Sequence, residues 1–183
     1  MRRHPRLLPL LVTLLLSGGA WAVDFKGIEL GQALWISEEQ SVFGRLDCNP
    51  MQLDPDAYQD YIEEQQQVFP DARKVCTGST SIAAIPAGAT VVLGASRRVL
   101  RLTFQFAGED YSQVLTAMME KWGEGVEEVR DENDKSVWWD FDDGISVSVH
   151  LTPYADASNS TDDNLLVGLA EYSLPVTTPS GDL

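Results

Sequence analysis

The segment VWWDFDDGISVSVHL, residues 137–151, constrains the fold more than any other stretch, because only one strand pairing suits its pattern. Successive side chains of a strand point to opposite faces, so a one-residue change of register turns every side chain over. A two-residue loop at 143–144 would mix polar and apolar residues on both faces. A three-residue loop at 142–144, with Gly144 in the left-handed conformation, gives one wholly apolar face. The predicted pairs are Phe141 with Ile145, Trp139 with Val147, and Val137 with Val149.

The same register places Trp138 on the opposite face of this hairpin. Its neighbours there are polar, because Trp138 then pairs with Ser148, Asp140 with Ser146, and Ser136 with His150. A tryptophan on an uncovered face is typical of a protein-binding anchor. The alternative is that the indole packs beneath a loop such as TPYADASNSTDDN, residues 152–164, and completes the core.

The first 22 residues have the three parts of a secretory signal peptide: arginines at positions 2, 3 and 6, an apolar run over 7–16, and small residues up to Ala22. The apolar run is shorter than the roughly 20 residues that a membrane-spanning helix needs. We therefore expect cleavage after Ala22, a single domain over 23–175, and a flexible tail over 176–183. The expected location is periplasmic or secreted.

The chain contains two cysteines, Cys48 and Cys76. Export to an oxidising compartment predicts that they form a disulfide. A catalytic thiol is the alternative, but it would need a histidine partner, and only His150 lies outside the signal peptide. Two cysteines and one histidine are also too few for a zinc site of the usual kind.

Hydrophobic spacing and turn residues predict the order of helices and strands. A short strand ending at Gly31 precedes helices at 33–40 and 54–68, the latter with Asp54 as N-cap and Pro55 in its first turn. A third helix follows Asp110 and ends before Gly123. Strands are predicted at 75–85, 89–94, 98–106, 126–129, 136–141, 145–151 and 166–174.

This order predicts an α+β fold in two layers, with helices packed on one face of a mostly antiparallel sheet. Each group of strands follows a helix, so the chain consists of two possible helix-plus-meander units. No residue-by-residue repeat accompanies them.

Several runs of the sequence resemble small exported bacterial proteins whose role is largely unassigned. These runs are GIELGQ, RVLRLTFQF, EDYSQVLTAMMEKWGEG, the tryptophan strand and LLVGLAEYSL. The architecture is similar to that of β-lactamase-inhibitor-type domains, in which helices cover one face of an antiparallel sheet and the other face can be open. The resemblance implies a binding or assembly role and assigns no individual residue.

The net charge is −15 and becomes more negative without the signal peptide. This charge limits the classes of partner that the protein can bind. Nucleic acid is excluded as a partner, because phosphate binding needs a basic face. A basic protein or a cation suits the charge better, although acidity also serves solubility alone. The acidic loops RDENDK, DFDDG and STDDN could hold calcium, but none matches the EF-hand spacing. We expect no metal and no cofactor.

The sequence therefore predicts an exported, non-enzymatic protein-binding module whose partner is another exported or envelope protein. The predicted binding residues are Trp138, His150, Asp140, Arg101 and Gln105. One alternative is a hydrolase that uses surface carboxylates or His150, but the chain has no G-x-S-x-G motif around a serine. A structural factor of the cell envelope is the other alternative.

Overall fold

The computed structural model describes residues 23–48, 55–153 and 166–175. The predicted signal peptide and the predicted tail lie outside the described residues, as does most of the loop over 152–164. Within the described part, no helix is long and apolar enough to cross a membrane.

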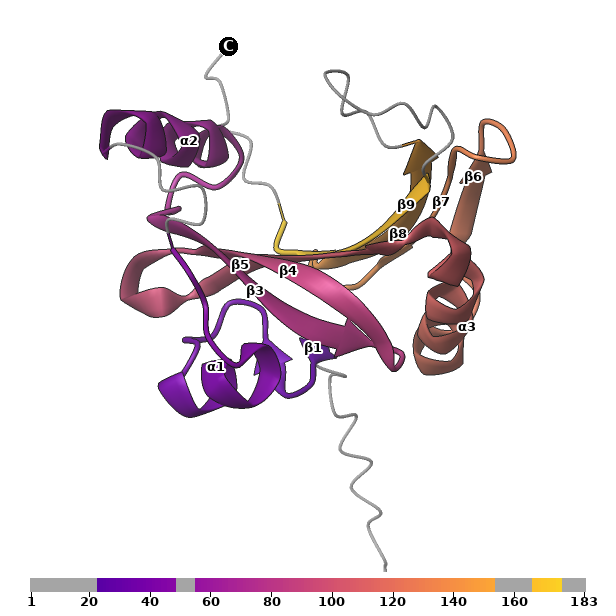
Figure 1. The fold of residues 1–183 in the computed structure, drawn as a ribbon, viewed down its shortest axis with the longest axis horizontal. Helices are drawn as coiled ribbons and strands as arrows, with labels where there is room; N and C mark the ends of the chain where they lie inside the picture. The colour runs from indigo at the N-terminus through magenta and orange to yellow at the C-terminus, as the bar shows by residue number, and fades with distance from the viewer. Residues whose placement is uncertain (1–22, 49–54, 154–165, 176–183) are drawn as a thin grey trace, which may run out of the picture.

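Three helices, a seven-stranded antiparallel sheet and a two-stranded sheet make up the described residues, which confirms the α+β class (Figure 1). The helices are α1 (Ile36–Phe43), α2 (Pro55–Val68) and α3 (Tyr111–Trp122). The strands of the small sheet are β1 (Asp24–Phe25) and β2 (Ile28–Glu29). The large sheet contains β3 (Lys74–Ile82), β4 (Ile85–Leu93), β5 (Val99–Ala107), β6 (Val126–Val129), β7 (Lys135–Asp140), β8 (Ser146–Pro153) and β9 (Leu166–Ser173).

The strand order β3-β4-β5-β9-β8-β7-β6 consists of two meanders placed side by side. One meander, β3-β4-β5, follows α1 and α2, and the other, β6 to β9, follows α3. They join through β5 and β9, the last strand of each. The structure thus contains the two helix-plus-meander units that the sequence predicts.

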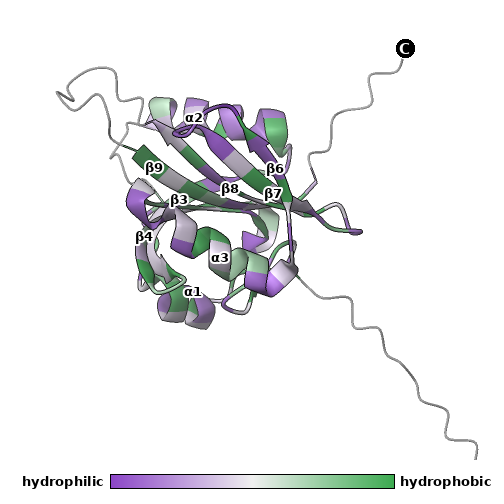
Figure 2. Cartoon of the chain, turned by 90° about the vertical axis from the view of Figure 1, so that its right-hand side faces the viewer, coloured by the Kyte–Doolittle hydropathy of each residue, from purple (hydrophilic) through white to green (hydrophobic). Residues whose placement is uncertain are grey.

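One face of the large sheet is apolar and carries the main core. Its residues alternate along the strands, as in Leu102 and Phe104 of β5, or Val147 and Val149 of β8, all fully buried. The helices α1 and α3 and the small sheet lie against this face. Figure 2 shows polar and apolar residues alternating along β8 and β9, as expected for strands with one buried face.

Helix α2 lies on the opposite face, which corrects the expectation that all helices share one side (Figures 1 and 2). Its Ile62 and the following Phe69 pack with Val75, Val92 and Leu100 in a second apolar cluster. These strand residues point away from the main core, so the sheet is apolar on both faces at this end. A register shift between Val92 and Leu93 is part of this arrangement.

The tryptophan hairpin has the predicted register. Trp139 pairs with Val147, Val137 with Val149, and Trp138 with Ser148. The loop is the predicted three-residue one, because the Phe141 N–H donates to Ile145 O at 3.0 Å and Gly144 has a φ of 79°. Trp139 is buried at 6 % exposure.

The turn between β3 and β4 differs from the prediction. The predicted strands at 75–85 and 89–94 leave the connection at 86–88, but Ile82 pairs directly with Ile85. The two loop residues are Ala83 and Ala84, with φ values of 50° and 66°. Both have the left-handed conformation of a tight two-residue hairpin, which alanine adopts only at some cost.

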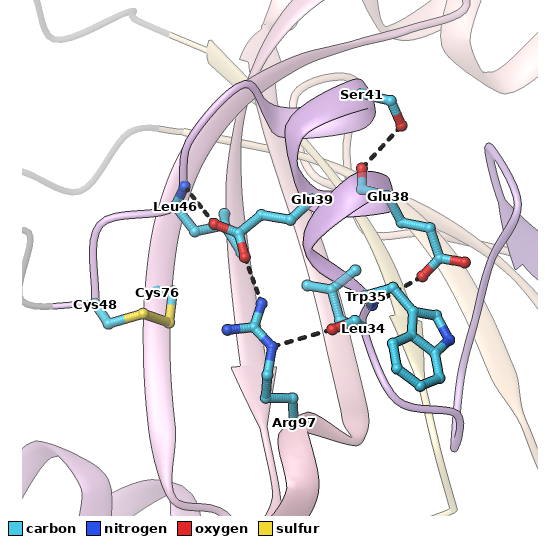
Figure 3. Close-up of polar contacts among 9 residues, drawn as sticks. All are labelled: Leu34, Trp35, Glu38, Glu39, Ser41, Leu46, Cys48, Cys76 and Arg97. Atoms are coloured by element: carbon cyan, nitrogen blue, oxygen red, sulfur yellow. Dashed lines mark hydrogen bonds and ion pairs between the residues drawn. A yellow bond between two sulfur atoms is a disulfide. The ribbon is translucent and has the colours of Figure 1, made fainter.

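Helix α1 is fastened to the tip of the β4–β5 hairpin (Figure 3). The Arg97 Nε–H donates to the Leu34 carbonyl at 3.0 Å, and the Arg97 guanidinium forms an ion pair with Glu39. Arg97 itself has a positive φ of 61°. Backbone strain of this kind persists where several contacts fix the residue.

The predicted disulfide between Cys48 and Cys76 is present. It joins the segment after α1 to β3 and closes the loop that contains α2 (Figure 3). Beside it, Asp47 and Thr77 exchange two backbone hydrogen bonds of 2.8 Å. The outer edge of β3 is therefore partly covered.

Candidate functional site

The candidate site is the part of the large sheet that lies on the α2 side but beyond α2. We call it the open face, because none of the described helices covers it. Its middle row crosses five strands in order: Thr103, Glu171, Ser148, Trp138 and Val126. None of these side chains is buried.

The structure brings all five predicted binding residues to this side of the sheet. On this face of the sheet, Arg101 and Gln105 lie on either side of Thr103 in β5. Asp140 is the next residue on this face after Trp138 in β7, and His150 is the next after Ser148 in β8. Trp138 and His150 line one hollow. Asp140 and Gln105 are exposed near the ends of their strands and do not line it.

The hollow beside Trp138 measures about 280 Å³. Arg130 is among the residues that line it, and its guanidinium lies 3.5 Å from Glu128 Oε1 and 3.6 Å from Asp134 Oδ2. The Arg130 side chain is 70 % exposed, so these ion pairs contribute little to stability. Displacing the Arg130 side chain from these ion pairs therefore costs little free energy.

A second hollow of about 370 Å³ lies on the other side of Arg130, towards β5. It shares Arg130, Asp134 and His150 with the first hollow and adds Thr103 and Glu171. The two hollows together form a polar surface with the indole of Trp138 at one end.

His150 lies between the two hollows and contacts a serine. Its Nε2 atom is 2.8 Å from the Ser148 hydroxyl. Burial lowers the pKa of His150 from its usual 6.5, and the nearby Glu171 and Asp134 only partly oppose this effect. The imidazole is therefore neutral at pH 7.

The depressed pKa predicts a pH dependence of stability. Because the unfolded chain takes up a proton near pH 6.5 and the folded His150 resists it, this contribution to stability is present above pH 6.5. It is lost as the pH falls through the lower folded pKa. Urea unfolding at pH 7.5, 6 and 5 should show a smaller loss on acidification for His150→Gln than for the natural chain. Parallel losses in both proteins would contradict the prediction.

Arg101 is engaged within the molecule rather than directed at a partner. Its guanidinium hydrogen-bonds the Gln65 side chain of α2 and lies 5.5 Å from the centre of the Phe69 ring. It is also 4.0 Å from Glu171. These contacts fasten α2 to the sheet, so Arg101 marks the boundary of the open face.

Sequence reasoning missed the most exposed apolar residues, Trp35 and Ile36, which are 67 % and 65 % exposed. They begin α1 on the other side of the molecule, where Figure 3 shows the Trp35 ring directed away from the ion pair of Arg97. Adjacent positions of a helix can both belong to its apolar stripe, as Val42 and Phe43 of α1 do, so helical spacing gives no signal for this exposure.

A larger and more apolar hollow, of about 500 Å³, lies near the end of α2. Phe69, Leu100, Ile145 and Leu174 line it. Of its three charged residues, Asp71 and Arg98 pair at 3.0 Å, and Asp143 is the third. Its lining comes from five separate segments, so no local pattern predicts it.

The described residues contain no group of three or more histidine, cysteine or acidic side chains that could hold a metal ion. Two of the three acidic loops considered for calcium, RDENDK and DFDDG, lie within this part of the chain. Asp131 and Asp143 instead accept backbone N–H bonds two residues on, at 2.7 and 3.1 Å. These are turn contacts. The third loop, STDDN, lies outside the described residues.

Comparison of the chain with protein-family models, with curated proteins and with solved structures finds no match. The likeness to β-lactamase-inhibitor-type domains therefore rests on sequence patterns alone.

Proposed function

We propose that this chain is an exported, non-enzymatic protein-binding module that engages its partner through the open face around Trp138. The observation that supports this most is the contrast between the two sides of one hairpin. Trp139, Val137 and the paired Val147 are buried on the side of the sheet that α3 covers. Trp138 is partly exposed on the other side, among serines.

Short side chains around Trp138 make it accessible. Ser148 pairs with it on one side, Val126 on the other, and Ser136 and Asp140 flank it along β7. An indole offers a large contact area with few rotatable bonds, so a partner can bury it at low entropic cost. The acidic character of the chain favours a basic partner, which would be another exported or envelope protein.

A hydrolase remains the second candidate function, and the Ser148–His150 contact of 2.8 Å is the observation in its favour. A serine nucleophile also needs a carboxylate or equivalent group to orient the imidazole and donors for an oxyanion. Among the described residues, no carboxylate hydrogen-bonds His150. The binding function therefore requires fewer additions to the site.

Site-specific photo-crosslinking in producing cells tests the proposed function. A benzophenone amino acid at Gln105, which is exposed on the open face, should yield one adduct of defined mass. The matched control carries the same group at Ser112, which is exposed on α3 at the other side of the sheet. Trp138→Ala should weaken the Gln105 adduct. Identical adducts from both positions, or none from Gln105, would reject the open face as the binding surface.

A further inference from the structure

The two edge strands of the large sheet, β3 and β6, differ in whether their outer backbone groups are hydrogen-bonded. On β3, the outer edge is bonded to the segment that precedes α2: Asp47 and Thr77 exchange backbone hydrogen bonds, and the disulfide Cys48–Cys76 fixes them. On β6, none of the described residues hydrogen-bonds the outer edge. An unpaired strand edge is a template for pairing with another chain.

The backbone groups that β6 leaves free can be assigned. The Arg130 N–H donates to Asp134 O at 3.0 Å, which marks this residue pair as hydrogen-bonded. Bonded and non-bonded pairs alternate along an antiparallel ladder, so the bonds of Val126 and Glu128 also point towards β7. The N–H and C=O groups of Glu127 and Val129 consequently point outwards.

The side chains of β6 add apolar surface to this edge. Val126 and Val129 are 59 % and 58 % exposed, and they lie on opposite faces of the sheet. Val126 is the cross-strand neighbour of Trp138, so the edge is continuous with the open face. A strand added here would cover a valine on each face.

We infer that β6 accepts an extended segment of the partner as an additional strand, and that this segment places lysine or arginine opposite the two glutamates of β6 and apolar residues opposite its two valines. The inference deepens the proposed function and rests on it, because the partner strand would continue the contact that begins at Trp138. Its backbone would bond Glu127 and Val129, as in other cases of strand addition.

Charge selects a basic segment over a second copy of this chain. Glu127 and Glu128 occupy the middle of β6, and the chain as a whole has a net charge of −15. If the outward groups of Glu127 bond a second β6 antiparallel, Glu127 lies opposite either Glu127 or Val129 of that copy, and the second register sets Glu128 opposite Glu128. Either register places glutamate beside glutamate, which destabilises the pair. Lysine or arginine in the partner strand makes the same positions favourable.

The probe for this inference is a short capped peptide that repeats the unit valine-lysine-lysine-valine, with the same peptide carrying glutamate in place of lysine as its charge control. At saturation, amide hydrogen exchange at Glu127 and Val129 should slow by about tenfold or more, while exchange at the outer edge of β3 stays unchanged. A valine and lysine peptide methylated on alternate backbone nitrogens should not produce this protection. Equal protection by the methylated peptide, or none by the parent peptide, would overturn the inference.

Glu127→Pro isolates the role of the edge. Proline removes an N–H that points outwards, so it leaves the bonds to β7 intact and blocks strand addition. Glu127→Thr is the matched control, because it removes the same charge and keeps the N–H. Both variants should unfold at nearly the same urea concentration, since Glu127 is exposed. The proline variant should bind the peptide about tenfold more weakly than the threonine variant; equal affinities would overturn the inference.

Failure of the edge and failure of the open face give different results. If Trp138→Ala weakens the cellular crosslink and Glu127→Pro leaves peptide binding unchanged, the open face is the binding surface and strand addition is rejected. If Glu127→Pro abolishes peptide binding and Trp138→Ala does not weaken the crosslink, strand addition is supported and Trp138 is rejected as the anchor.

Discussion

Replacing Trp139 with alanine should lower the free energy of unfolding by about 3–5 kcal/mol, whereas the same change at Trp138 should cost less than about 1.5 kcal/mol. Trp139 is buried, its ring centre lies 5.8 Å from that of Trp122, and its indole N–H donates to the Gly123 carbonyl at 3.0 Å. Alanine at this position leaves both a cavity and a carbonyl without its partner.

Urea unfolding followed by far-ultraviolet circular dichroism measures both variants, because tryptophan fluorescence would itself change. Trp138 and Trp139 are consecutive in β7 and lie on opposite faces of the sheet, so each variant is a control for the other. Large and equal losses for the two variants would show that the open face is covered, and the proposal built on Trp138 would then be wrong.

Removal of the disulfide should have the second large effect. The bond joins cysteines 28 positions apart, and loss of such a cross-link costs about 3–4 kcal/mol on the chain-entropy model. Cys76 is fully buried. Replacing both cysteines with serine should therefore lower stability by at least this amount.

Reductant distinguishes the bond from the side chains. A thiol reductant should destabilise the natural chain and leave the double serine variant unchanged. Alkylation of the unfolded natural protein without prior reduction should modify neither cysteine. Two modified thiols would show that Cys48 and Cys76 are not bonded.

Alternation along a strand made the hairpin register predictable. Val137 and Trp139 of β7 and Val147 and Val149 of β8 form two rows of alternate apolar residues, so only one pairing buries all four, and the predicted pairs Val137–Val149 and Trp139–Val147 are present. The same reasoning placed Trp138 on the open face. This part of the site depends on local pattern alone.

The position of α2 was not predicted, although the sequence contains the signal for it. Val91, Val92 and Leu93 are consecutive, as are Val99 and Leu100, and all are buried. A run of consecutive apolar residues in a strand indicates burial on both faces, whereas alternation indicates one. Treating every strand as covered on one side therefore gave the wrong face for α2.

Two further features escaped prediction for physical reasons. The β3–β4 turn uses Ala83 and Ala84, which have no turn propensity of their own, because the pairing of the flanking strands imposes it. The hollows of the open face bring Arg130 from the β6–β7 turn together with Glu171 of β9. That meeting depends on the insertion of β9 between β5 and β8, which no local pattern contains.

The insertion of β9 at the centre of the sheet has a consequence for the order of folding. β5 pairs with β4 early in the chain, but its other side must wait for β9, whose residues Val167 and Ser173 pair with Ala107 and Arg101. Helix α3 and three strands are made in between. Pairing between strands so far apart in sequence is slow to form. Until β9 pairs with it, β5 is an edge strand with unpaired backbone groups. The final described strand therefore determines when the two halves become one sheet.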